Sequence, residues 1–235
     1  MSEIIEKLRE ELIAKSDEQL QKSSQYFFKE YIRCYGMKSA TLSTICKDYF
    51  KMVKDKTKAE IFDLCDELWQ SGVIEEGFVA CNWSYYIRKK YKPDDLKLFE
   101  EWIDSYVNNW ASCDTMGNHT VGSFLEMYPE FVHELKRWTQ SPNRWMRRAS
   151  AISLIVPARH GKFLQDIFEI ADLLLLDGDD MVRKGYGWML KVASQSHQKE
   201  VFDYVMSKKA IMPRTALRYA IEKMPAELKT KAMEK

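Results

Sequence analysis

Helix-start signals recur about every 35 residues along this chain, and each marks the second helix of a helix–turn–helix unit. Apolar residues follow the 3.6-residue period of an α-helix from end to end, and no stretch shows the alternation typical of a β-strand. A regular series of helix pairs indicates a helical solenoid, in which each pair buries its apolar face against the next. The second helices are expected to begin near residues 74, 109, 143, 179 and 214.

The units share little sequence, which favours HEAT-like or armadillo-like repeats over tetratricopeptide repeats. We therefore predict an all-α fold, an α-α superhelix of such repeats, forming a single domain over residues 1–235. Three helices are expected before the pairs, over residues 2–13, 16–31 and 39–53. The predicted pairs are 58–70 with 74–91, 93–106 with 109–127, 129–140 with 143–155, 162–176 with 179–193, and 197–207 with 214–224.

The composition, with 46% hydrophobic and 30% charged residues, is that of a soluble globular protein. No apolar run reaches the roughly 18 residues that a membrane helix needs. The opening stretch MSEIIEKLREEL has the pattern of a charged amphipathic helix and not that of a secretory signal. We therefore expect a cytoplasmic protein with no membrane partner.

The five cysteines are odd in number and lie within apolar helical patterns, which is typical of free thiols in a reducing compartment. No CxxC motif occurs, and the four histidines are scattered. Cys113 and His119 form the nearest Cys–His pair, and alone they do not make a zinc site. The sequence therefore predicts no metal and no cofactor.

The charge is unevenly distributed, although the net charge is only +1. Residues 1–135 contain 17 Lys and Arg against 24 Asp and Glu, whereas residues 136–235 contain 19 against 11. A basic second half indicates a polyanionic partner. The same asymmetry is equally compatible with two well-solvated surfaces, so charge alone leaves both interpretations open.

Trp110 and Asp114 form the first group of candidate site residues. Four residues apart on a predicted helix, they lie on one face. The simpler interpretation is a core-edge indole and an acid in the first turn stabilised by the helix dipole. The functional interpretation depends on residues of two later helices.

The next two second helices carry basic and aromatic residues that do not follow a core pattern. Arg144 and Arg148 share one helix face, and Arg147 is a further candidate in the same stretch. On the following helix, residues at i, i+4 and i+7 share a face, namely Lys184, Trp188 and Lys191. Gly185 and Gly187 in the middle of that helix cost about 1 kcal/mol each relative to alanine, so we expect a neighbouring helix or a ligand backbone to approach closely there.

Trp110, Arg148 and Trp188 recur at intervals of 38 and 40 residues, about one repeat each. In a solenoid they are expected to stand near one another, at roughly the 10 Å spacing of adjacent helices. Two indoles, a guanidinium and nearby lysines suit a sugar-phosphate chain. A carboxylate repels phosphate, so Asp114 fits such a surface only if positive charge develops beside it, as it does in glycosidic cleavage.

Three motifs in this order, Trp110-x3-Asp114, Asn143-x-Trp145-x2-Arg148-Ala149 and Gly187-Trp188-x-Leu190, resemble those of the AlkD-type DNA alkylation-repair glycosylases. The early stretch Tyr26-x8-Tyr35-Gly36-Met37-Lys38 is similar to the N-terminal part of that family. The resemblance covers nearly the whole chain in length and in the order of helices.

The resemblance implies a HEAT-like solenoid that removes cationic N3- and N7-alkylated purines from duplex DNA without a metal or cofactor. It assigns contacts with the deoxyribose to Trp110, Trp188 and Asp114, and contact with the DNA backbone to Arg148. Further DNA contacts are expected from Tyr26, Lys38, Arg144, Arg147, Lys184 and Lys191. No lysine is singled out as a Schiff-base nucleophile, so we expect a monofunctional enzyme that leaves an abasic site. No pocket loop for a flipped base is evident, and the resemblance likewise implies that the lesion is recognised through its backbone. We further expect a monomeric, nucleoid-associated protein of bacterial type.

Two other functions remain open at this stage. A helical solenoid can be a protein-interaction scaffold, because such folds commonly bind peptides along one wall. A non-catalytic relative that binds unusual DNA structures would use the same basic surface without releasing a base. The remaining tryptophans are expected in the core: Trp69, Trp83, Trp102, Trp138 and Trp145.

Overall fold

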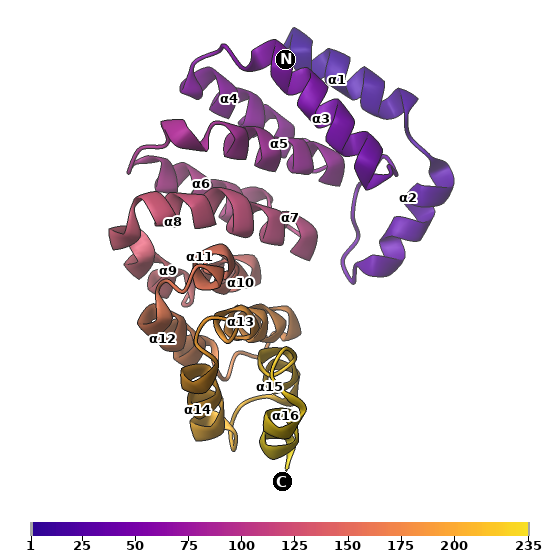
Figure 1. Cartoon of the computed structure of the whole chain (residues 1–235). Helices are drawn as coiled ribbons and strands as arrows, with labels where there is room; N and C mark the ends of the chain where they lie inside the picture. The colour runs from indigo at the N-terminus through magenta and orange to yellow at the C-terminus, as the bar shows by residue number, and fades with distance from the viewer. Residues whose placement is uncertain (1, 235) are drawn as a thin grey trace. The chain divides into compact units, whose positions relative to one another are not determined.

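The computed structural model describes residues 2–234, and within this range the chain is all-α with no β-strand. The chain divides into two compact units, residues 1–115 and residues 116–235, which we call unit 1 and unit 2. Figure 1 shows helices packed in consecutive pairs within each unit. The prediction of an all-α fold built from helical repeats is confirmed.

Unit 1 begins with α1 (Glu3–Ala14), which packs on α3, and its first pair is formed by α4 and α5. A capping box starts α4, because Thr57 and Glu60 satisfy each other's backbone N–H groups. The last helix of the unit, α7, packs against α5. After α1 the elements are α2 (Glu18–Ser24), the 3-10 turn η1 (Gln25–Phe27), α3 (Ser39–Val53), α4 (Lys58–Trp69), α5 (Ile74–Tyr86), the 3-10 turn η2 (Arg88–Lys90), α6 (Asp95–Tyr106) and α7 (Trp110–Thr115).

Unit 2 starts with the π-helical turn η3 (Met116–Val121) and continues through further helix pairs. Its centre is α13, which packs against α10, α11, α12 and α15. The other elements are α8 (Gly122–Met127), the 3-10 turn η4 (Pro129–Phe131), α9 (Val132–Trp138), α10 (Arg144–Ile152), α11 (Ile155–Arg159), α12 (Leu164–Leu174), α13 (Asp180–Ala193), α14 (Gln198–Lys208), α15 (Arg214–Ala220) and α16 (Ala226–Met233).

The predicted starts of the second helices are confirmed to within one residue. The observed first residues are Ile74, Trp110, Arg144, Asp180 and Arg214. Side-chain caps fix two of these starts, since Asn143 accepts the N–H of Trp145 and Asp179 accepts the N–H of Met181, both as N-cap residues.

Five predicted helices end early or break. Two of them, expected over 74–91 and 214–224, end at Tyr86 and Ala220. The helix expected over residues 16–31 ends at Ser24, because the Gln25 side chain bonds the following loop. The helix expected over 143–155 divides after Ile152, since Pro157 has no N–H to continue the hydrogen-bond ladder. The helix expected over 109–127 contains the π-helical turn η3, which helical periodicity does not reveal. The last helix, α16, lies beyond the predicted pairs.

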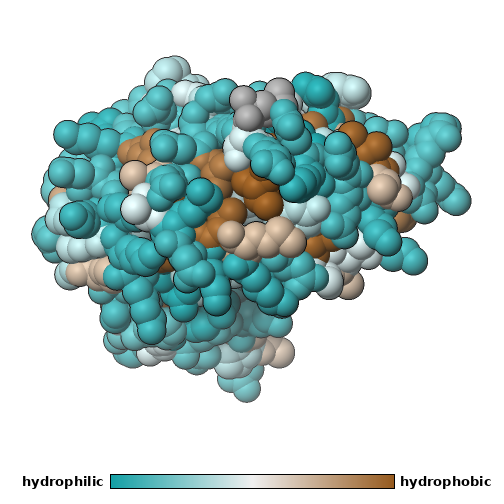
Figure 2. All heavy atoms as spheres, turned by 90° about the horizontal axis from the view of Figure 1, so that it is seen from above, coloured by the Kyte–Doolittle hydropathy of each residue, from teal (hydrophilic) through white to brown (hydrophobic). Residues whose placement is uncertain are grey.

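The five tryptophans expected in the core are all buried, as are the five cysteines. Most of the surface visible in Figure 2 is hydrophilic, and apolar side chains reach it only in a few separate patches. No helix within residues 2–234 combines the length and the apolar character needed to span a bilayer.

Candidate functional site in the two units

Trp110 is the first residue of α7, and its half-buried indole is held by the segment that follows α2. The ring stacks on Phe28, with centroids 5.4 Å apart and planes inclined by 21°. The indole Nε1–H donates to the carbonyl oxygen of Phe27 at 3.2 Å. Asp114 lies one turn further along α7 and is also half-buried. The structure therefore places both residues on one helix face, as the spacing predicts.

Tyr26 and Lys38, the other candidates of unit 1, are both exposed. Tyr26 lies in η1, directly before the two phenylalanines that contact Trp110, and its side chain is 90% exposed. Lys38 is the N-cap residue of α3. The structure therefore brings the segment of Tyr26 next to Trp110, whereas Lys38 belongs to a different element.

Two buried acids of α5 hold the chain that follows this segment. Glu75 accepts the backbone N–H groups of Tyr35 at 3.0 Å and Gly36 at 2.9 Å. Burial raises the pKa of the Glu75 carboxyl, and these backbone donors partly offset that effect. Glu76 accepts the hydroxyl of Tyr35 at 2.7 Å and pairs with Arg9 at 2.8 Å. The stretch from Tyr35 to Gly36 is thus anchored to α5 through both backbone and side chain.

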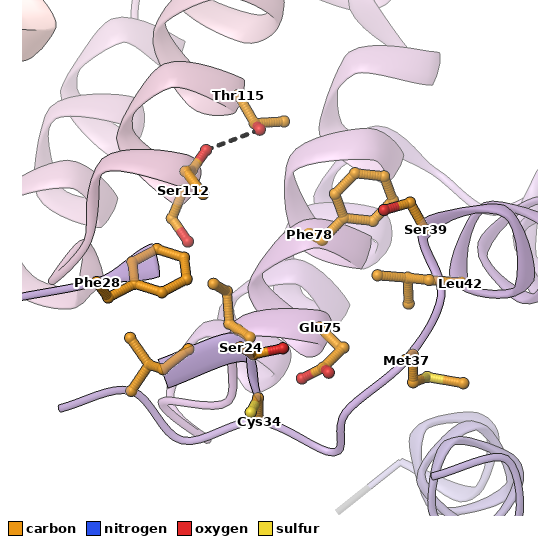
Figure 3. Close-up of a pocket in the computed structure, with 13 residues that line it drawn as sticks. Ser24, Phe28, Cys34, Met37, Ser39, Leu42, Glu75, Phe78, Ser112 and Thr115 are labelled. Carbon is orange, nitrogen blue, oxygen red and sulfur yellow. Dashed lines mark hydrogen bonds between the residues drawn. The ribbon is translucent and has the colours of Figure 1, made fainter. Parts of the chain in front are cut away.

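A cavity of about 170 Å³ opens among these elements of unit 1 (Figure 3). Ser112 and Thr115 border it from α7, one residue on either side of the Cys113–Asp114 pair. Thr115 donates its hydroxyl to the carbonyl oxygen of Ala111 at 2.8 Å, so this hydroxyl already has a hydrogen-bond acceptor. The walls are mainly apolar and include Phe28, Ile32, Leu42, Ile74 and Phe78. The sequence does not predict this cavity, because its lining residues come from several segments and form no motif.

Arg148 is the most buried candidate of unit 2, since the residue as a whole is only 5% exposed. Its guanidinium donates to the carbonyl oxygen of Met181 in the first turn of α13. The aliphatic part lies against Gly185, where a Cβ would stand 3.3 Å from Arg148 Cγ. Gly185 therefore makes room for Arg148.

Gly187 has a different neighbour. A Cβ at this position would lie 2.7 Å from Tyr219 Cβ and 2.9 Å from the carbonyl oxygen of Ala216, both on α15. The sequence predicts that a neighbouring helix or a ligand backbone approaches the mid-helix glycines. At Gly187 the structure shows a neighbouring helix, α15. At Gly185 the neighbour is the Arg148 side chain.

Trp188 is half-buried on α13, and the two lysines predicted to share its face each have an acidic partner. Lys184 pairs with Asp180 at 2.7 Å, and Lys191 pairs with Glu222 at 2.9 Å. All four charged side chains retain some exposure. The side chains of Lys184 and Lys191 are 30% and 15% exposed, so both ion pairs are partly shielded from solvent. The contact of either lysine with DNA stays a prediction.

The two remaining arginines have partners within the fold. Arg147 pairs with Asp177 at 2.7 Å and donates to the carbonyl oxygens of Ser141 at 2.9 Å and Pro142 at 3.0 Å. Arg144 pairs with Asp179 at 3.2 Å and lies 4.5 Å from the ring centroid of Trp145. Arg147 thus stabilises the loop at Ser141 and Pro142, which precedes α10. The contact of either arginine with DNA stays a prediction.

The four residues predicted as catalytic are divided evenly between the units, with Trp110 and Asp114 in unit 1 and Arg148 and Trp188 in unit 2. Within residues 2–234, no group of three or more His, Cys, Asp and Glu side chains is arranged to hold a metal ion.

A family model described as DNA alkylation repair enzyme matches residues 8–224, which is most of the chain. The chain belongs to this family. The family places its role in DNA repair and makes DNA the substrate. A solved structure from Enterococcus faecalis, described as a predicted DNA alkylation repair enzyme, has the same fold, with a TM-score of 0.81 and 13% sequence identity. The similarity covers 90% of this chain and 98% of that one. No curated protein sequence matches this member of the family.

We expect Arg148→Ala to lower the stability of this DNA alkylation repair family member by about 1–3 kcal/mol. The substitution leaves the carbonyl oxygen of Met181 without this donor and opens a cavity beside Gly185. If the guanidinium also contacts a phosphate, the slope of log affinity against log salt concentration falls by about one. Urea unfolding and DNA binding at several salt concentrations measure the two effects. A stability equal to that of the wild type would contradict the structural part.

Proposed function

We propose that this protein is a DNA glycosylase that removes cationic N3- and N7-alkylated purines from duplex DNA. The observation that carries the proposal concerns the seven tryptophans. The five that fit a core pattern are buried, and the two expected to contact the deoxyribose, Trp110 and Trp188, reach the surface. A half-buried indole leaves part of its ring surface open to a ligand.

In the proposed mechanism Asp114 stabilises the positive charge that develops on the deoxyribose as the glycosidic bond breaks, and it orients the attacking water. Trp110 and Trp188 pack against the sugar and attract its partly positive C–H groups. The half-burial of Asp114 supports its role, because a partly desolvated carboxylate interacts more strongly with a cation than a fully hydrated one does.

Arg148, together with Arg144, Arg147, Lys184 and Lys191, supplies the positive charge that attracts the phosphate backbone to unit 2. The Arg148 side chain is buried beside Gly185, and a hydrogen bond to the carbonyl oxygen of Met181 orients its guanidinium. A fixed cation positions the backbone with less loss of side-chain entropy than a mobile one.

A cationic alkylpurine is already a good leaving group, so the reaction needs no strong general acid. The proposal includes no lysine that forms a Schiff base, and the expected product is therefore an abasic site in an uncut strand. It includes no pocket for a flipped base, and it assigns no role to the cavity of unit 1. The proposed place of action is the bacterial cytoplasm, where the protein would act on the nucleoid as a monomer.

The decisive experiment measures release of 7-methylguanine and 3-methyladenine from methylated duplex DNA by the wild-type protein. We expect both bases to be released, with no change on addition of a metal chelator. DNA binding without release would indicate a non-catalytic DNA-binding relative. Absence of both binding and release would favour a protein-interaction scaffold.

A further inference from the structure

The segment from Gln25 to Arg33, which we call the aromatic arm, exposes three large rings within six residues. Tyr26 is 90% exposed, Phe27 is 74% exposed and Tyr31 is 81% exposed. Large apolar and aromatic side chains that gather on a surface mark an interaction site, whereas single exposed ones do not. The arm is therefore a candidate binding element of unit 1.

Hydrogen bonds fix the backbone of the arm. The Gln25 side chain donates to the carbonyl oxygen of Glu30 at 2.7 Å and accepts the N–H of Ile32 at 3.1 Å. The carbonyl oxygen of Arg33 accepts the N–H of Ile74 at 2.9 Å, which ties the end of the arm to α5. A loop that is already ordered loses little entropy when its side chains bind a partner.

The arm also holds the indole of Trp110. The carbonyl oxygen of Phe27 accepts the indole N–H at 3.2 Å, and the Phe28 ring stacks on the indole at 5.4 Å. The Phe27 side chain itself points away from this contact into solvent, as its exposure shows. A partner that covers the exposed rings of the arm therefore lies next to Trp110.

The charge around the arm suits a polyanion. Residues 21–38 contain four basic residues, Lys22, Lys29, Arg33 and Lys38, against one acid, Glu30. Unit 1 as a whole has the opposite balance, with 17 Lys and Arg against 21 Asp and Glu. A hollow of about 480 Å³ beside the arm is bordered by Lys22, Tyr31 and Arg33. Lys22 pairs with Glu18 at 2.6 Å and Lys38 is the N-cap residue of α3, so Lys29 and Arg33 are the basic residues of the arm itself.

We propose that the aromatic arm is a duplex-DNA contact, in which Phe27 and Tyr31 pack against deoxyribose rings and Lys29 contacts a phosphate. Contacts with the sugar-phosphate backbone carry no sequence information, which suits a protein that must examine undamaged DNA. The proposal rests on the proposed function for the identity of the partner, and it extends the DNA contacts to residues for which no motif gives a role. The arm would also place the lesion strand beside Trp110.

The test compares Phe27→Ala and Tyr31→Ala with Ile13→Ala and Met52→Ala, which remove exposed apolar side chains elsewhere in unit 1, where they are 59% and 65% exposed. Fluorescence anisotropy measures the affinity for an undamaged duplex and for one with a tetrahydrofuran abasic-site analogue. We expect each arm variant to bind about 10-fold more weakly, with an unchanged salt slope, because each loses apolar contact area and no charge. Lys29→Ala is expected to lower the salt slope by about one. The two controls should bind like the wild type.

All four apolar variants are expected to fold, because the replaced side chains lie mainly in solvent and the Phe27 carbonyl oxygen that holds Trp110 is retained. Unchanged affinity of both arm variants would overturn the proposal. It would also be overturned if the arm variants lost binding to anionic phospholipid vesicles while binding DNA normally, since the rings would then serve a membrane surface.

The test separates this proposal from the proposed glycosylase. Arm-dependent DNA binding without base release would support the arm and contradict the glycosylase. Base release with arm-independent binding would contradict the arm alone. A wild-type protein that does not bind duplex DNA would contradict both.

Discussion

Asp114→Asn is expected to lower the rate of base release about 1000-fold while DNA affinity stays equal or rises. The amide keeps the size of the side chain and removes its charge. A carboxylate about 4 Å from a developing cation, at an effective dielectric constant near 20, contributes about 4 kcal/mol. That energy corresponds to roughly three powers of ten in rate. Affinity for undamaged DNA does not fall, since a negative charge next to phosphates is removed.

Single-turnover release of 7-methylguanine and anisotropy with undamaged duplex measure the two quantities. Asp55→Asn is the matched control, because Asp55 is an exposed acid of the same unit and matches none of the site motifs. Its rate should equal that of the wild type. A rate for Asp114→Asn within about 10-fold of the wild type would remove Asp114 from the mechanism, since about 1.4 kcal/mol is too little for an ion contact of this kind.

The helix pairs could be predicted because local chemistry marks their ends. Asn143 and Asp179 cap their helices with side-chain oxygens, and the sequence shows both residues directly before a helical pattern. The tryptophans could be sorted in the same way, since the period of apolar residues separates a core face from a solvent face. These features depend on residues only a few positions apart.

Features that depend on distant residues could not be predicted. The sequence around Arg147 shows no acidic partner for it. In the fold its partner is Asp177, which lies 30 residues further along the chain. Lys191 and Glu222 meet across 31 residues in the same way. The basic surface expected from sequence is therefore partly neutralised by acids whose position no local pattern gives.

The aromatic arm shows the same limit at short range. Residues 16–31 have a helical pattern, yet the Gln25 amide bonds three backbone groups between Phe28 and Ile32 and holds the chain in a loop. A side chain that competes with the backbone ladder ends a helix without glycine or proline. The cavity of unit 1 was missed because its lining residues come from α2, α3, α5, α7 and the loop after η1, and share no motif.

Gly36→Ala is expected to lower the free energy of unfolding by about 2–5 kcal/mol. Gly36 has φ +80°, and the left-handed region costs about 1–2 kcal/mol for alanine. A Cβ there would also collide with the carbonyl oxygen of Asp17 and the backbone nitrogen of Gln21, both at the start of α2. Backbone atoms cannot rotate away as a side chain does, so the collision adds about 1–3 kcal/mol.

Gly72→Ala is the matched control, because Gly72 also has a positive φ, +66°, but a Cβ at that position would meet no atom within 4 Å. Gly72→Ala should therefore lower the free energy of unfolding only by the cost of the left-handed backbone conformation, about 1–2 kcal/mol. Urea unfolding of both variants measures the difference. Because α2 leads directly into the aromatic arm, the displacement caused by Gly36→Ala should also weaken DNA binding, whereas Gly72→Ala should not. If the two variants were equally stable, α2 would have moved to accommodate the added methyl group. The arm would then be held less rigidly than its hydrogen bonds indicate.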